Sequence, residues 1–172
     1  DFTKRKQISI GAMDTIIDCK KLGDHVELGD PLFVFDEYGT FGGDNSEDDE
    51  VYALLTENLD SEMVAQMIHQ TPKSPITGVI SDIKIYWTVP TDKMSPSVSK
   101  LVNSYITKLK KEIVEEEKFS GKKSPKRVLL EVSKPDANTG RINGAEIPEN
   151  GGILIEYFIS HDDTMSTGDK IA

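Results

Sequence analysis

The sequence contains one cysteine among its 172 residues, Cys19, which excludes an internal disulfide bond and a cysteine-based zinc site. No apolar run approaches the ~20 residues of a membrane-spanning helix. The first residues lack the order of charged, apolar and small residues that marks a signal peptide. These absences predict a protein of the cytoplasm, with no membrane partner.

Positive charge is also scarce. The sequence has 20 Lys and Arg residues and 30 Asp and Glu residues, which gives a net charge of −10. Proteins whose main role is to bind the phosphates of nucleic acids need clustered Lys and Arg residues. We therefore do not expect nucleic-acid binding to be the main role of the chain.

Residues that would carry chemistry are scattered. His25, His69 and His161 occur in unrelated contexts and are expected to be surface or core histidines. Residues 42–50 resemble a calcium loop but lack its alternating oxygen ligands, so a solvated linker is expected, with no metal and no cofactor in this chain. An enzyme that acts alone is the weakest hypothesis, since no acid, base and nucleophile converge.

The first third of the chain predicts short strands with tight turns, over residues 7–10, 15–17, 25–28 and 32–35. Gly23 and Gly29, each followed by Asp, provide the backbone freedom for two reversals six residues apart. Residues 37–50 are acidic and rich in glycine, which is typical of a connector.

Two short helices are predicted next, over residues 51–59 and 61–70, with apolar residues at helical spacing. A strand follows to Trp87, and Ser95-Pro96 then predicts the start of a long helix that ends near Lys118. Beyond Gly121 we expect a strand over residues 128–132, a loop over 134–152 and a last strand over 153–160 with one buried face. The predicted fold class is α+β: a small β sandwich with helical excursions at residues 37–73 and 95–120.

The phrase LGDHVELGDPLFVF (residues 22–35), followed by SPITGVI (residues 74–80), resembles the barrel-sandwich hybrid of biotin and lipoyl carrier domains. Those carriers need a modified lysine on the hairpin between the two halves. Residues 36–71 contain no lysine, and the Asp-Lys-Met at residues 92–94 comes after the second turn, on the wrong side. The resemblance therefore implies the fold without the prosthetic group.

The last residues add a third landmark. Gly168-Asp169-Lys170-Ile171-Ala172, after a strand and a polar linker, resemble the motif that leads into the active-site region of the β subunit of multisubunit DNA-directed RNA polymerases. The two earlier phrases resemble the strands and turns of the flap domain in the same subunit, in the same order. The resemblance implies that residues 1–172 form a flap-like domain, cut from a longer chain. An Arg-His-Gly-Asn-Lys-Gly-like stretch is expected to follow.

By this resemblance residues 37–71 occupy the place of the flap tip, which lies over the RNA exit channel and docks a sigma factor. The residues implied in docking are apolar or aromatic: Val51, Tyr52, Leu54, Leu55 and Leu59. The alternative is that this face packs on the second helix through Met63 and Met67. Further partners implied are the other polymerase subunits and nascent RNA.

Lys170 matches the family lysine beside the RNA 3′ end, where it supplies positive charge while Mg²⁺ held by a partner subunit does the main work. The chain alone is expected to be inactive. Its divergence from cellular β subunits favours a viral polymerase, such as that of a large bacteriophage, acting in the host cytoplasm. The competing interpretation is a stand-alone interaction module on a carrier-like sandwich.

Overall fold

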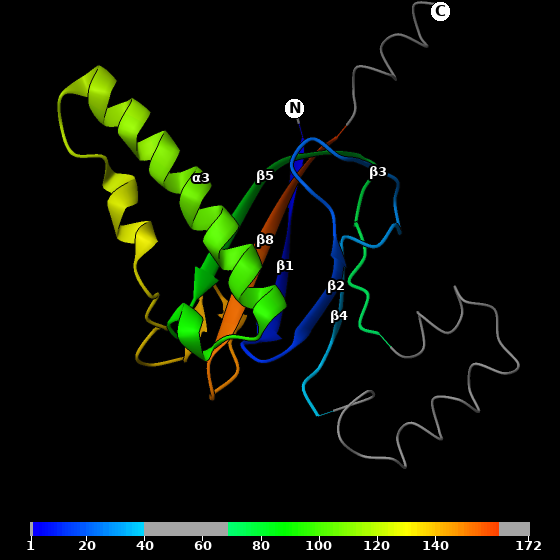
Figure 1. Ribbon diagram of the computed structural model, residues 1–172. Helices are drawn as coiled ribbons and strands as arrows, with labels where there is room; N and C mark the ends of the chain where they lie inside the picture. The colour runs from blue at the N-terminus through cyan, green and yellow to red at the C-terminus, as the bar shows by residue number, and fades with distance from the viewer. Residues whose placement is uncertain (1, 40–68, 162–172) are drawn as a thin grey trace, which may run out of the picture. The chain divides into compact units, whose positions relative to one another are not determined.

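The computed structural model describes residues 2–39 and 69–161 (Figure 1). Contacts along the chain divide it into two compact units, and strands β1, β5 and β8 contribute residues to both. Unit 1 comprises Asp1–Ile8, Asp14–Lys84 and Glu156–Ala172, and unit 2 comprises Ser9–Met13 and Ile85–Ile155.

A four-stranded sheet has the order β1-β8-β5-β3. Its strands are β1 (Thr3–Gly11), β8 (Gly152–His161), β5 (Gly78–Trp87) and β3 (His25–Val26). Strand β3 pairs antiparallel with β5. Because each of these strands overlaps one expected from the sequence, four predicted strands are confirmed, although β3 is shorter and β1 longer than predicted.

Strand β8 is more deeply buried than its alternating pattern suggests. Leu154 and Glu156 were expected on an exposed face, yet they are 0% and 2% exposed, like their neighbours Ile155 and Tyr157. The expectation of one exposed face is wrong for this part of β8. Side chains that point to opposite faces of the sheet are buried here, so both faces of this part of β8 are covered.

In unit 1, β2 (Thr15–Cys19) pairs antiparallel with β4 (Phe33–Asp36), with an irregularity between Ile16 and Asp18. Both strands were predicted. The rings of Phe33 and Phe35, two residues apart on β4, lie 5.9 Å apart and are buried. These aromatic side chains form part of the core of unit 1.

The long helix of unit 2, α3 (Pro96–Ser120), begins and ends where the sequence predicts. The Ser95 side chain accepts a hydrogen bond from the Val98 amide at the N-terminus. Gly121 ends the helix with φ of 71°, a left-handed conformation that glycine adopts without strain. Its buried residues are Val98, Val102, Leu109 and Ile113.

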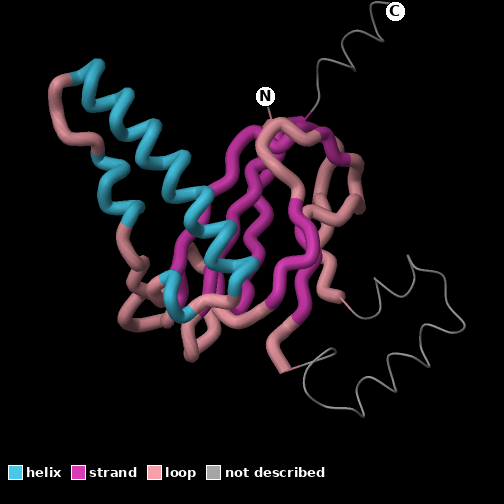
Figure 2. Tube along the Cα trace, viewed as in Figure 1, coloured by secondary structure: helices cyan, strands magenta, loops and turns pink. Residues whose placement is uncertain are grey.

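The strand expected over residues 128–132 is wrong. Residues Pro125–Leu130 form a 3₁₀ helix, η2, which packs against α3 in the same unit (Figure 2). A strand needs a paired neighbour, and here the Ser124 side chain instead accepts a hydrogen bond from the Lys126 amide and starts a helical turn. The expected loop over 134–152 contains a small hairpin of β6 (Arg141–Ile142) and β7 (Ala145–Glu146).

The described chain thus combines an antiparallel sheet with one long helix, which confirms the α+β class. The helices expected over residues 51–59 and 61–70 fall mainly on residues 40–68, outside the described part of the chain.

Candidate functional site

The residues singled out for function lie outside the described residues. These are the docking residues Val51, Tyr52, Leu54, Leu55 and Leu59, together with Lys170. The structure instead describes the frame in unit 1 from which residues 40–68 depart and to which they return. That frame is the candidate site, and it is built from the two turn motifs.

Two copies of one turn form the first part of the frame. In each, the aspartate carboxylate accepts a hydrogen bond from the amide three residues earlier: Asp24 from Lys21 at 2.7 Å and Asp30 from Glu27 at 2.8 Å. The glycine before each aspartate has φ of 90°. Only glycine adopts this value readily, so both predicted Gly-Asp turns are confirmed.

Both turns bind the segment SPITGVI, which is distant in sequence. Each turn exchanges two backbone hydrogen bonds with one residue of this segment. The bonds are Gly23 N to Ile80 O (2.8 Å), Ile80 N to Asp24 O (2.9 Å), Gly29 N to Ser74 O (2.9 Å) and Ser74 N to Asp30 O (2.8 Å). Two of the sequence landmarks therefore form one continuous structure.

Gly78, in the centre of the second landmark, lies against the backbone of Ser160 on β8. A Cβ atom at this position would collide with the Ser160 carbonyl oxygen and carbon. The close approach of the two strands therefore requires glycine here.

The described residues on either side of positions 40–68 are paired through their backbones, and we call this pairing the neck. Phe35 and Gln70 exchange two backbone hydrogen bonds, Phe35 N to Gln70 O at 3.0 Å and Gln70 N to Phe35 O at 2.8 Å. Beside this pair the His69 ring contacts the Asp36 carboxylate through a short polar interaction. The chain is therefore held side by side at Phe35–Asp36 and His69–Gln70, on either side of positions 40–68.

The outgoing side of the neck has a further anchor. The buried Asp14 carboxylate, 7% exposed, accepts a hydrogen bond from the Tyr38 amide at 2.9 Å. The Tyr38 side chain is 75% exposed. The anchor therefore holds the backbone of the departing chain and leaves its aromatic ring in solvent.

Two buried polar residues on β8 complete unit 1, and the sequence pattern did not identify them. Glu156 is 2% exposed and accepts a hydrogen bond from Gln7 Nε2 at 2.9 Å, with Arg5 Nη1 at 3.6 Å. The Tyr157 hydroxyl donates to the Lys20 carbonyl at 2.8 Å. Burial is the main cause that raises the pKa of Tyr157 far above its usual range, with Cys19 adding to it. Tyr157 therefore acts as a neutral anchor between β8 and the strand before the turns.

The side chains that could carry catalysis stay apart. His25 is exposed, with Nδ1 3.9 Å from Glu27, and His69 is part of the neck. The Cys19 thiol has a pKa raised by burial and then by Asp18, which makes it a poor nucleophile. Within residues 2–39 and 69–161, no three His, Cys, Asp or Glu side chains gather as metal ligands. No helix in that part of the chain has the length and apolar content to cross a membrane.

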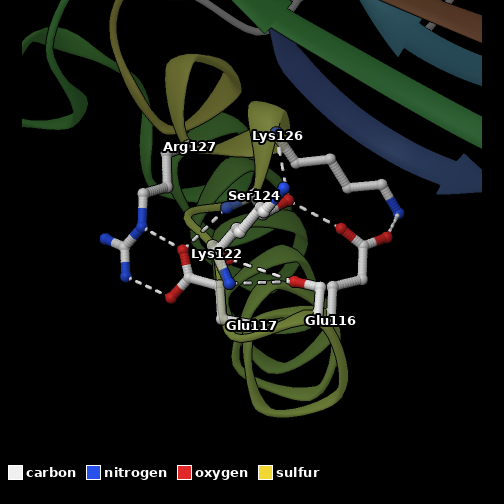
Figure 3. A network of polar contacts seen from close by, with 7 residues as sticks. Glu116, Glu117, Lys122, Ser124, Lys126 and Arg127 are labelled. Atoms are coloured by element: carbon white, nitrogen blue, oxygen red, sulfur yellow. Dashed lines mark hydrogen bonds and ion pairs between the residues drawn. The ribbon is translucent and has the colours of Figure 1, made fainter.

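In unit 2, charged side chains join the end of α3 to η2 (Figure 3). Arg127 binds both oxygens of Glu117, with Nη2 to Oε1 at 2.6 Å, and Lys126 Nζ lies 2.8 Å from Glu116. The Ser124 amide also donates to Glu117. Hydrogen bonds from Arg127 and then from Ser124 lower the pKa of Glu117 from 4.5 to about 2. The network fixes η2 beside α3.

No protein-family model matches the sequence, and no curated protein matches it.

Proposed function

We propose that the chain is the flap domain of the β subunit of a multisubunit DNA-directed RNA polymerase, with residues 37–71 as the tip. One observation carries the proposal: two sequence landmarks of the flap hydrogen-bond to each other, and the segment between them departs through a closed neck. In this proposal the paired backbone at Phe35 and Gln70 forms the base of the tip.

In this proposal the tip binds a sigma-like initiation factor through Val51, Tyr52, Leu54, Leu55 and Leu59, over the channel where nascent RNA leaves. The barrel-sandwich hybrid is the proposed form of the core of unit 1. Lys170 belongs to the motif that continues toward the active site, where the polymerase, in the cytoplasm, uses Mg²⁺ held by its partner subunit.

The first test reads the source gene beyond the codon for Ala172. An in-frame Arg-His-Gly-Asn-Lys-Gly-like stretch is expected, since that sequence continues the motif begun at Gly168. A stop codon or an unrelated sequence would instead favour the stand-alone interaction module.

The second test concerns docking. Leu54→Asp is expected to abolish binding of the polymerase's initiation factor, measured by calorimetry, while the melting temperature stays unchanged. Leu28→Asp is the matched control, because Leu28 is 68% exposed at a turn outside the tip. If Leu54→Asp lowers the melting temperature, the predicted helix packs within the chain, and the docking assignment is wrong.

A further inference from the structure

Helix α3 segregates its charges although the whole chain is acidic. On one solvent-exposed side of the helix, the residues that follow one another at helical spacing include no carboxylate. Its members are Lys100, Ser104, Thr107, Lys111, Val114 and Lys118, all exposed. Lys118 lies 18 positions after Lys100, so at a rise of 1.5 Å per residue the side is about 27 Å long. We call it the basic stripe.

The stripe ends beside an exposed aromatic ring and two lysines, Phe119, Lys122 and Lys123, which we call the basic end of α3. Phe119, in the last turn of α3, is 98% exposed, and Lys122 and Lys123 follow directly after Gly121. Among the described residues neither lysine forms a close ion pair, although the charge of Lys123 contributes to lowering the pKa of Glu117. Because the Phe119 ring is almost fully in water, it contributes no burial of apolar surface to the stability of the isolated chain.

Three carboxylates near this end of α3, those of Glu112, Glu116 and Glu117, are paired. Glu117 is bound by Arg127, and Lys126 lies 2.8 Å from Glu116 and 3.6 Å from Glu112. Glu115 flanks the stripe on the helix. The polar network that fixes η2 (Figure 3) thus also partly offsets the negative charge near the lysines at this end of α3.

We infer that the basic stripe and the basic end of α3 bind a single-stranded nucleic acid, with phosphates along the lysines and one base stacked on Phe119. A row of cations with an aromatic ring is the arrangement by which proteins hold unpaired strands. A duplex would leave Phe119 unused, because its bases are already stacked. The net charge of −10 does not prevent binding, since charges beyond about 8 Å are screened at physiological salt. The inference holds whether or not the chain belongs to a polymerase.

The test measures fluorescence anisotropy of labelled 20-nucleotide oligo-uridine and oligo-deoxythymidine with the whole chain, over a range of salt concentrations. Phe119→Ala is expected to weaken binding about tenfold through lost stacking, and Phe119→Trp to restore it. The double variant Lys122→Gln/Lys123→Gln is expected to reduce the slope of log affinity against log salt by about 1.4, or ~0.7 for each phosphate contact on a single strand.

Matched controls make the same kinds of substitution, of lysine and of phenylalanine, at positions outside α3. Lys4→Gln/Lys21→Gln removes two exposed lysines of unit 1, and Phe2→Ala removes a ring that is 51% exposed. Both are expected to bind as the unchanged chain does. Circular dichroism of each variant shows whether α3 is intact, so that unfolding is not mistaken for lost binding.

Binding of either oligonucleotide with the expected losses supports the inference, and a preference between them identifies RNA or DNA. Three outcomes overturn it. The first is no binding of either strand. The second is an equal loss of binding in the controls and in the variants of Phe119, Lys122 and Lys123. The third is equal binding of a 20-base-pair duplex or of poly-glutamate with no effect of Phe119→Ala, which would indicate an unspecific or peptide-binding cationic surface.

Discussion

Removing one oxygen atom tests the anchor that joins β8 to the strand before the turns. Tyr157→Phe keeps the ring, which is 2% exposed, and deletes the hydroxyl that donates to the Lys20 carbonyl at 2.8 Å. A buried neutral hydrogen bond contributes about 1 kcal/mol, and the carbonyl loses this donor, so the expected cost is about 1–2 kcal/mol. For a chain of this size that corresponds to a melting temperature lower by about 2–8 °C.

The assay is urea unfolding followed by circular dichroism, with Tyr86→Phe as the matched control. Tyr86 is on β5, and within the described residues its hydroxyl forms no hydrogen bond, so its loss should cost little. Because the pKa of Tyr157 is raised in the folded chain, the difference between the two variants should remain constant up to about pH 9 and shrink as pH rises past the unfolded pKa of about 10. Equal stability of the two variants would refute the anchoring role.

Two further predictions concern packing and charge. Gly78→Ala is expected to destabilise the chain by about 1–3 kcal/mol or more in the same unfolding assay, because the added methyl group collides with the Ser160 backbone; wild-type stability would show that the strands can separate freely. Arg127→Gln is expected to raise the pKa of Glu117 from about 2 toward 4.5, measured by NMR titration. Since the folded pKa is depressed, the pairing stabilises the chain above about pH 4.5 and is lost as pH falls toward 2. An unchanged Glu117 pKa would contradict the assigned cause.

Local signals explain which elements were predicted correctly. Helix α3 is specified by a serine cap, a proline at its first position and a glycine at its end, and each acts on its own turn of backbone. The twin turns were equally readable, since glycine with positive φ and an aspartate that accepts a local amide need no distant partner.

Tertiary contacts explain the failures. Residues 128–132 are rich in β-branched and aliphatic side chains, but the ion pair of Arg127 with Glu117 holds this segment beside α3, where no strand is available for pairing. Glu156 fits an exposed strand position by type, yet it is buried because Gln7 and Arg5 reach it from elsewhere in the chain.

The candidate site divides in the same way. The sequence by itself determined the two Gly-Asp turns, the α+β class and the ends of α3, because these depend on interactions within a few residues. Only the tertiary structure decided that the turns bind residues 74–80, that the neck closes at Phe35 and Gln70, and that the carboxylates at the end of α3 are paired. The first two features join residues far apart in the sequence, and the third joins two different helices. No periodic pattern records which partner outside its own element a backbone amide or a carboxylate will find.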